Sequence, residues 1–297
     1  MSFEKFKPVI WADGIDKGLE EEMTAYEDTN HSFEGKVEGP GDTIKFKGTG
    51  NVTVTHYSDG KLHDVSDPET PPDMTQSLKI MQVDEINFGV DDLDKAQAHN
   101  GGELIEHFTA DTKFQLAGHQ DSYIYGLGAS KGYNAATEAF DVTQTPLIET
   151  LDTTAAALTY DTIMPQIDNL LVKLLNNKVS RSMGLVLALP PEACMLLRRN
   201  YVLTDTDNSE LLKNGFIGRY NHITIKESVN TCRYASGNDT IFEAQLKTKR
   251  AIGFAKPFMH LEPYRPEKKF MDAVKGYAVY DGMILRPKEI INWKFKI

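Results

Sequence analysis

Two histidines and three aspartates lie close together in one stretch of the chain, and they form the first group that could do chemistry. They are His56, Asp59, His63, Asp64 and Asp67. Imidazole and carboxylate groups are ligands that Zn²⁺ takes in hydrolases. Such ligands must be held on a rigid scaffold, whereas residues 58–75 are rich in Asp, Pro and Gly and predict an exposed loop. The pattern favours a solvated loop, and a metal-dependent hydrolase using His56 and His63 is the least favoured function.

The other acidic and histidine patterns also lack the spacing that metal binding needs. Asp91, Asp92 and Asp94 have neither the glycine nor the distal glutamate of a calcium-binding EF-hand loop. They are typical of acids at the positive end of a helix dipole. His107 and His119 are three helical turns apart, too far to share one ion. No metal site is therefore predicted.

Nucleophile and phosphate-binding signals are equally weak. The glycine-rich stretch 126–132 is not a Walker motif and follows no strand, so it predicts a loop after a long helix. Three serines, Ser180, Ser182 and Ser228, have no nucleophile-elbow context. The sequence therefore predicts no catalytic residue and no cofactor, and we expect that the chain is not an enzyme.

Length and composition indicate a soluble globular protein with room for more than one domain. The chain has 297 residues, of which 40% are hydrophobic and 25% charged. No apolar run is long enough to cross a bilayer, so no membrane partner is expected. The N-terminal sequence lacks the pattern of a signal peptide. Cys194 and Cys232 have no nearby partner that marks a catalytic thiol, and they are predicted to be reduced and packed.

Charge is distributed unevenly along the chain. The net charge of −11 argues against nucleic-acid binding as the main role. Residues 1–75 carry a net charge of −9, residues 76–242 carry −8, and residues 243–297 carry +6. These segments are either solvated faces or complementary surfaces that meet between subunits. The clusters Arg198-Arg199 and Lys247-Lys249-Arg250 favour solvated faces or subunit contacts over DNA binding.

The N-terminal third predicts one short helix and one hairpin. Apolar residues from Ile15 to Tyr26 recur at helical spacing, so 14–27 is predicted to be an amphipathic helix. In 32–76, two alternating runs flank Gly48-Thr49-Gly50, a strand–turn–strand pattern. They contain Ile44, Phe46, Val52 and Val54. An isolated hairpin is marginal in water, so this one must pack on something else, such as a neighbouring subunit.

The middle of the chain predicts a long strand followed by a long helix. Residues 77–90 predict one strand, and a helix is expected from Asp91 to about Leu127. Gly101-Gly102 should bend or break that helix, because each glycine costs about 1 kcal/mol relative to alanine. Residues 128–145 are rich in Gly, Ala and Thr and predict a crossing segment.

The following part predicts an α/β layer. Apolar spacing from Leu158 to Leu174 indicates a second helix, disturbed at Pro165. The apolar run 185–189 is typical of a buried strand, and Pro190-Pro191-Glu192 predicts the start of a helix. Residues 214–218 predict a turn that leads into a strand at 223–225.

The last fifty residues combine short strands with charged and glycine turns, and with earlier segments they carry a resemblance. The motifs that carry it are 33–35, 41–44, 52–54, 91–97, 117–121, 185–187, 190–192, 214–218, 228–230, 251–255, 262–267, 275–277, 280–283 and Arg286-Pro287. In this order they resemble the major capsid proteins of tailed bacteriophages with the Johnson fold. The resemblance covers nearly the whole chain, although Gly101-Gly102 is unexpected inside a spine helix of that family.

The resemblance implies an α+β, Hong Kong 97-like fold with five segments. These are an N-terminal arm (1–31), an extended E-loop hairpin (32–76), a peripheral domain with a long strand and spine helix (77–140), an axial domain (141–242) and return strands of the peripheral domain (243–297). It also implies a coat protein that is assembled in the host cytoplasm and forms the icosahedral head of a virion around double-stranded DNA. The alternative within this fold is the shell of a bacterial encapsulating nanocompartment.

The partners implied are chiefly further copies of the chain, arranged as pentamers and hexamers. Scaffolding, portal and decoration proteins are further expected partners, and packaged DNA is expected to be contacted only weakly and non-specifically. In that family the E-loop of one subunit lies over the peripheral domain of another. Together with the charge distribution, this implies that acids of the hairpin meet bases of the C-terminal strands. The expected contact residues are Glu34, Glu38, Asp42, Lys268, Lys269 and Lys275.

Overall fold

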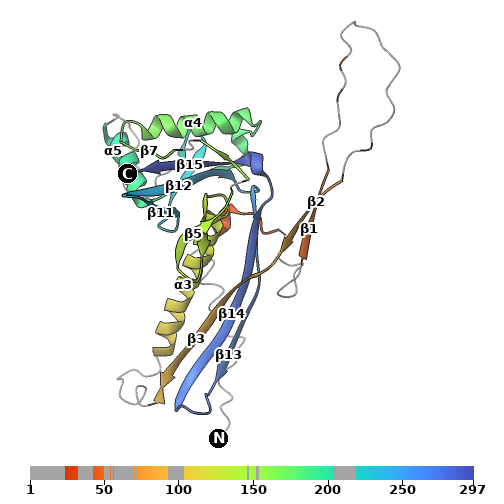
Figure 1. Cartoon of the computed structure of the whole chain (residues 1–297), viewed down its shortest axis with the longest axis vertical. Helices are drawn as coiled ribbons and strands as arrows, with labels where there is room; N and C mark the ends of the chain where they lie inside the picture. Colours follow the sequence, from red (N-terminus) through yellow and green to blue (C-terminus); the bar gives the residue numbers. More distant parts are fainter. Residues whose placement is uncertain are drawn as a thin grey trace.

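A long, narrow sheet projects from a broader sheet with helices packed against it (Figure 1). The structure is a computed structural model. It describes residues 24–32, 43–49, 54, 56, 70, 73–92, 104–145, 147–151, 154–203 and 219–297. Mixed helices and strands over these ranges agree with the expected α+β class.

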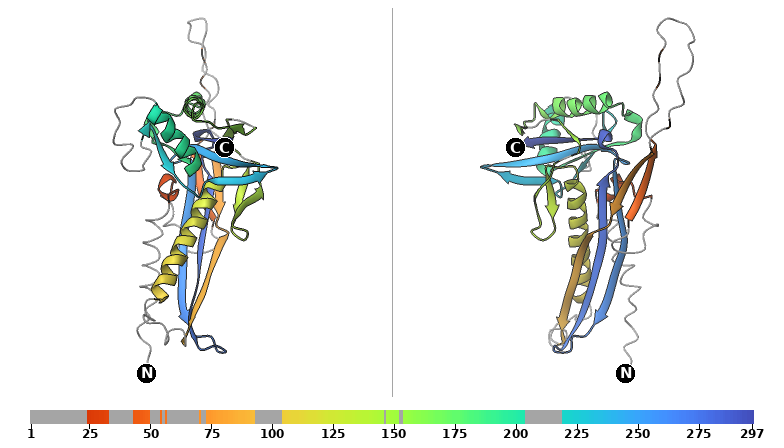
Figure 2. Two further views of the ribbon diagram at one scale, coloured as in Figure 1. Left: turned by 90° about the vertical axis from the view of Figure 1, so that its left-hand side faces the viewer. Right: turned by 45° about the vertical axis from the view of Figure 1, so that its right-hand side comes forward.

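The long sheet has three antiparallel strands in the order β13-β14-β3. Their bounds are Ile252–Tyr264 for β13, Met271–Ile284 for β14 and Gln82–Asp91 for β3. Helix α3, Leu104–Gly126, runs along this sheet (Figures 1 and 2). Its buried residues share a core with both outer and central strands, including Ile86, Phe254 and Tyr280. The spine helix predicted to end near Leu127 is confirmed at that end, and its described part begins just after Gly101-Gly102.

The broader sheet has eight strands, and the chain threads it out of sequence order. Six form the path β6-β15-β12-β8-β10-β9, while β11 pairs with β12 and β7 with β15. The bounds are Glu149–Thr150 (β6), Ala156–Ala157 (β7), Leu185–Leu189 (β8), Arg219–Tyr220 (β9), Ile223–Glu227 (β10), Cys232–Ser236 (β11), Asp239–Thr248 (β12) and Ile290–Lys296 (β15). Two short 3-10 helices, Arg181–Met183 (η3) and Pro287–Glu289 (η4), precede β8 and β15.

Two helices supply the apolar cover of the broader sheet. Helix α4, Ile163–Asn176, buries one face and contacts β15 and the next helix. The residues of that face are Ile163, Ile167, Leu170, Leu171 and Leu174. Helix α5, Pro191–Leu203, begins with a proline, whose missing N–H is harmless in the first turn, as predicted. Strand β8 is buried at every position, and β10 lies parallel beside it, so both predicted strands are confirmed.

Two small hairpins complete the described structure. Strand β1, Thr43–Thr49, pairs with β2, Asp73–Lys79, in antiparallel register. Strand β4, Lys131–Asn134, pairs with β5, Ala139–Thr143. The crossing segment expected at 128–145 therefore contains a hairpin, which its Gly, Ala and Thr content did not reveal.

The predicted partners within the N-terminal hairpin are wrong. Gly48 and Thr49 continue β1 instead of forming the turn, and Val54 is exposed and outside any strand. The strand expected over 77–90 is also broken. It divides at Ile80 and Met81, where Ile80 is buried and the Met81 N–H donates to Asp281 at 3.0 Å. These contacts turn the chain from the hairpin into the long sheet.

The C-terminal segment does not return as a whole to the long sheet, as 243–297 was expected to do. Strands β13 and β14 lie there, but β15 and residues 243–248 of β12 lie in the broader sheet. Pro165 does not disturb α4, because it stands in the first turn, where no N–H is required. The helix begins at Ile163 and not near Leu158.

The structure describes only part of the helix, bend and turn that the sequence predicted elsewhere in the chain. Of the helix expected over 14–27, only residues 24–27 lie among the described residues, and Tyr26–Asp28 forms a 3-10 helix, η1. The bend at Gly101-Gly102 and the turn at 214–218 lie outside the described residues. Both cysteines are free and buried, as predicted. Within the described ranges, no helix is long and apolar enough to cross a membrane.

The burial of β8 generates a direct test of the broader sheet. Val186 is buried between β12 and β10. Val186→Asp would leave an unpaired carboxylate in the core and should cost several kcal/mol, so we expect insoluble protein. Val172→Asp, at an exposed position of α4, is the matched control and should remain soluble. A soluble Val186→Asp protein that melts like the wild type would contradict the strand assignment.

Candidate functional site

The six expected contact residues fall into two groups. Glu34, Glu38 and Asp42 lie outside the described residues. Lys268 and Lys269 are exposed in the turn between β13 and β14. Lys275, on β14, already has partners within the chain: its Nζ lies 3.3 Å from Glu262 and 5.1 Å from the ring centroid of Tyr264.

Most other bases of the C-terminal segment are also paired inside the chain. Lys294 lies 3.4 Å from Glu243, Lys296 lies 2.8 Å from Asp239, and Arg250 lies 2.9 Å from Glu289. Arg265 binds Asp92 and Asp272. These pairs neutralise much of the +6 charge. Lys268 and Lys269 are exposed without a charged partner among the described residues, and they lie in the turn 265–270, which we call the tip.

The clusters named as solvated basic faces are paired as well. Arg198 binds Glu227 at 2.7 Å, and the Arg199 guanidinium lies 5.0 Å from the ring centroid of Tyr160. Lys247 is buried, so the expectation of a solvated face is wrong there. The alternating pattern of β12 hides this residue, because its neighbours Gln245 and Glu243 are polar and also buried.

The histidines first considered as metal ligands are not brought together. His56 is exposed, and His63 lies outside the described residues. Among the residues with described positions, no group of three or more His, Cys, Asp or Glu side chains could hold a metal ion. His119 lies instead between two carboxylates, 3.6 Å from Asp84 and 3.9 Å from Glu138. Its hydrogen bond with Asp84 raises the pKa of His119, against the opposing effect of burial.

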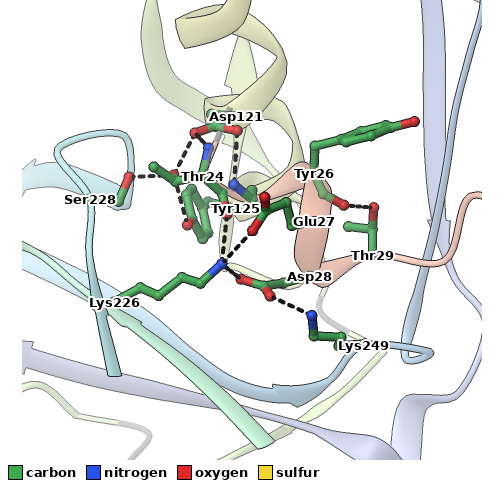
Figure 3. Close-up of polar contacts among 11 residues, drawn as sticks. Thr24, Tyr26, Glu27, Asp28, Thr29, Asp121, Tyr125, Lys226, Ser228 and Lys249 are labelled. Atoms are coloured by element: carbon green, nitrogen blue, oxygen red, sulfur yellow. Dashed lines mark hydrogen bonds and ion pairs between the residues drawn. The ribbon is translucent and has the colours of Figure 1, made fainter. Parts of the chain in front are cut away.

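A dense group of polar contacts lies where residues 24–30 dock, as Figure 3 shows. We call residues 24–30 the clasp. They touch α3, β10 and β13, so they join the long sheet to the broader one. Buried polar groups of this kind must find partners, because an unpaired one costs about 1–3 kcal/mol.

Asp121 of α3 is the main acceptor of the clasp. Its carboxylate accepts the N–H groups of Thr24 at 2.8 Å and Ala25 at 3.0 Å, and the Thr24 hydroxyl at 2.6 Å. The same hydroxyl lies 3.3 Å from Tyr125 and 3.2 Å from Ser228. Burial raises the pKa of the Asp121 carboxyl, and the hydrogen bonds from the clasp oppose that rise. Asp121 thus fixes the start of the clasp on the helix.

Asp28 binds the other end of the clasp to the broader sheet. It is buried, and its carboxylate lies 2.7 Å from Lys226 Nζ and 3.7 Å from Lys249 Nζ. Lys226, on β10, also lies 3.5 Å from Glu27. The attraction within a buried ion pair offsets the free-energy cost of desolvation only when the charged groups have several partners. Here Asp28 has two lysine partners.

The clasp also extends the long sheet at its inner end. Asn30 exchanges backbone hydrogen bonds with β13, donating to Ile252 at 2.8 Å and accepting from Phe254 at 3.1 Å. The Tyr26 ring meets the Phe254 ring edge to face, with centroids 6.1 Å apart, and Lys256 Nζ lies 4.5 Å from the Tyr26 centroid. The clasp therefore holds by apolar and aromatic contacts as well as by charge.

Lys247 lies under the clasp with 2% of its surface exposed. Its ammonium has no hydrogen-bond partner within the described part of the chain, and it lies 5.8 Å from the ring centroid of Tyr125. Burial lowers the pKa of Lys247 to about 8, although the charges of Asp28 and Asp121 act in the opposite direction. A charged lysine at this buried position is costly, so Lys247 lowers the free energy of unfolding.

Glu243 is a second buried carboxylate that ties strands together. It accepts the Ser130 N–H at 2.7 Å, the Asn292 side chain at 2.6 Å and the Tyr234 hydroxyl at 2.8 Å. These partners come from the turn after α3, from β15 and from β11. Like the clasp, this arrangement holds several elements of the fold in place.

Comparisons with known proteins identify the fold but no sequence family. No family model and no curated protein sequence matches the chain. A solved structure from Mycobacterium phage Che8 matches with a TM-score of 0.69 at 22% identity, covering 91% of this chain and 90% of that one. The capsid of Cyanophage P-SCSP1u matches with a TM-score of 0.59 at 16% identity, covering 89% and 84%.

A third similar structure comes from a virus-like particle of Pyrococcus furiosus. It matches with a TM-score of 0.54 at 12% identity, covering 95% of this chain and 96% of that one. The likeness extends over nearly the full length of each chain. The chain therefore has the α+β Johnson fold of capsid proteins, as the resemblance implied.

The buried lysine generates a pH-dependence prediction. Because the pKa of Lys247 is about 8 in the fold and 10.5 in a free side chain, the unfolded chain binds the extra proton between these values. Stability from this group therefore rises with pH across that window. Lys247→Met should raise the free energy of unfolding at pH 7 by about 3 kcal/mol, and the gain should shrink toward pH 10.5.

The measurement is denaturant unfolding of the unassembled protein at several pH values. Lys178→Met, at an exposed position, is the control and should differ from the wild type by the same small amount throughout. A gain from Lys247→Met that stays constant from pH 7 to about 10.5 would contradict the argument.

Proposed function

We propose that the chain is the major capsid protein of a tailed bacteriophage, which self-assembles into an icosahedral head around double-stranded DNA. The observation that carries this proposal is the full-length fold similarity to phage structures, including the capsids of Cyanophage P-SCSP1u and Ralstonia phage GP4. On this proposal the protein is located in the virion and is assembled in the host cytoplasm. Its role is structural, not enzymatic.

The N-terminal hairpin supports this role, because it has little core of its own. Its buried side chains, Ile44 and Leu78, join a small cluster with Ile80, Ala255 and Val279 at the edge of the long sheet. The strands β1 and β2 project away from the rest of the chain (Figure 1). A hairpin that packs so little on its own chain is stabilised by a neighbour, as the E-loop of a capsid protein would be.

The five segments of such a protein can be assigned to this chain. We assign the arm to 1–31 and the E-loop to 32–79, because β2 ends at Lys79. The peripheral domain is the long sheet with α3, and the axial domain is the broader sheet with α4 and α5. The clasp is then the end of the arm, and it holds these two domains together.

Partners other than the chain itself follow from the same proposal. Scaffolding, portal and decoration proteins would meet the shell at defined places, and packaged DNA would be contacted weakly and without sequence preference. The net charge of −11 supports weak DNA contact, because phosphate binding depends on clustered Lys and Arg.

A second candidate is the shell of an encapsulating nanocompartment. The similarity to a virus-like particle from Pyrococcus furiosus favours it. The two candidates differ in what the particle contains. Electron microscopy of particles purified from infected or expressing cells, with analysis of their content, separates them: packaged DNA supports the head, and an enclosed enzyme supports the nanocompartment. A protein that stays monomeric in every preparation contradicts both.

The hairpin generates a prediction for assembly. Thr49 lies opposite Asp73, so residues 50–72 can be replaced by Asn-Gly, which closes a two-residue turn between antiparallel strands. We expect this variant to be folded and soluble, because β1 and β2 both stay whole, but unable to form shells. A deletion of 48–74 would also remove residues of both strands.

Melting temperature and negative-stain microscopy measure the two outcomes separately. The melting temperature of the unassembled variant should match that of the wild type. Shells of normal size from the variant would refute the role of the hairpin in assembly.

A further inference from the structure

Four neighbouring strands of the broader sheet begin or end at one edge, and the segments attached to them there are basic. The register places Leu185, at the start of β8, opposite both Ile223 of β10 and Thr248 of β12. Lys247 lies opposite Ile290, where β15 starts before running to the C-terminus at the opposite edge (Figure 1). Neighbouring strands are about 4.8 Å apart, so these four strand ends span about 15 Å. We call the segments at these ends the basic edge: 177–184, 219–222, 249–251 and 285–289.

Side-chain contacts join the four segments of the basic edge into one surface. Arg181 donates to Asn221 Oδ1 at 3.1 Å and so joins the segment before β8 to the turn before β10. Arg250, in the turn after β12, lies 3.1 Å from Met183 Sδ and forms two hydrogen bonds of 2.9 Å with Glu289. These contacts link that turn to the segments before β8 and β15. The basic edge is therefore continuous.

The basic edge carries seven Lys and Arg residues and one acid, a net charge of +6. Its bases are all exposed: Lys178, Arg181, Arg219, Lys249, Arg250, Arg286 and Lys288. The acid, Glu289, is buried and binds Arg250 and Arg286. Lys249 lies 3.7 Å from the buried Asp28. The other four bases have no carboxylate partner among the described residues, so most of this charge faces solvent.

The phosphate backbone of double-stranded DNA fits the charge of this surface. Duplex DNA carries one negative charge per about 1.7 Å of its axis, so the roughly 15 Å of the basic edge faces about nine phosphates. Because the basic edge carries +6 within a chain total of −11, the remaining residues carry −17. Those residues repel a polyanion as a whole, so the basic edge determines which side of the chain meets it.

The residue types of the basic edge favour nucleic acid over a protein partner. The centres of protein–protein interfaces are depleted of charged residues, whereas protein–DNA interfaces are more polar and much more positively charged. Met183 is the one exposed large apolar side chain in these four segments. From the sequence, Lys249 and Arg250 favoured a solvated face or a subunit contact, because the other five bases are far from them along the chain. The fold brings all seven together.

We propose that the basic edge binds the phosphate backbone of double-stranded DNA without sequence preference. This inference rests on the proposed function and deepens it by naming the surface that meets packaged DNA. Lys178, Arg219 and Lys288 contact phosphates directly, while Glu289 holds the guanidinium group of Arg250 in place. We expect a dissociation constant of about 10⁻⁴ to 10⁻⁶ M at physiological salt, the range of non-specific DNA binding.

Fluorescence anisotropy of a short labelled DNA duplex, titrated with the unassembled full-length chain at several NaCl concentrations, tests this inference. Lys178→Gln, Arg219→Gln and Lys288→Gln in one chain should weaken binding at least about tenfold at low salt. The slope of log affinity against log salt should become shallower by about 2.7, because each lost phosphate contact contributes about 0.9. All three side chains are exposed, so the melting temperature should match that of the wild type.

Two further variants separate charge at this place from charge in general. Lys178→Arg, Arg219→Lys and Lys288→Arg together keep the charge of the basic edge and should bind DNA like the wild type. Lys268→Gln, Lys269→Gln and Lys275→Gln remove the same charge from exposed positions on the long sheet, and the salt slope should not change. Equal weakening by the two glutamine triples would overturn the basic edge as the binding surface.

The same variants decide between DNA and a second copy of the chain. If the glutamine triple of the basic edge keeps full DNA affinity but forms no shells, the basic edge is a contact between copies and the inference is overturned. A wild type that binds no DNA overturns it as well. Because binding is measured on unassembled chains, a wild type that binds DNA at the basic edge but forms no shells contradicts the proposed function and supports the DNA-binding surface.

Discussion

The long sheet is narrow, and one helix covers only part of it. Much of its outer half is therefore left exposed, and this constraint shapes the rest of the structure. The sheet has three strands and one helix along it. Near the broader sheet, residues 252–255 of β13 are fully buried, whereas most described residues of 259–264 are partly or fully exposed. The tip lies at the end of this poorly covered part. An exposed sheet surface of this kind is one that a neighbouring chain can cover.

The inner end of the same sheet is held by buried polar groups. The chain passes from β12 of the broader sheet into β13 of the long sheet. It returns from β14 of the long sheet to β15 of the broader one, so it crosses between the two sheets twice. Three buried carboxylates lie around this crossing. Asp121 accepts three bonds from the clasp, Asp28 pairs with Lys226 and Lys249, and Glu243 accepts bonds from the turn after α3, from β15 and from β11. Such networks fix a unique arrangement because partial satisfaction is costly. A rigid junction beneath an open, projecting sheet suits a subunit that reaches toward its neighbours.

Patterns of neighbouring residues predicted those helices and strands whose formation depends on nearby sequence. The apolar run Leu185–Leu189 and the proline at the start of α5 were sufficient for strand and helix. Pairing across long separations was not predictable: β1 joins β2 across residues 50–72, whereas Gly48-Thr49-Gly50 indicated a nearer partner. The clasp was missed for a similar reason. Asp121 reads as an ordinary helix acid, and only its spacing of four from buried Ala117 and Tyr125 indicates an inward direction.

The central claim is that neighbouring copies complete the open half of the long sheet. Amide hydrogen exchange, compared between assembled particles and dissociated subunits, tests it most directly. The account predicts that residues 43–49, 73–79 and 259–264 exchange about tenfold or more slowly in particles, while Leu185–Leu189 is equally protected in both states. Equal exchange of all these segments in the two states would contradict the account.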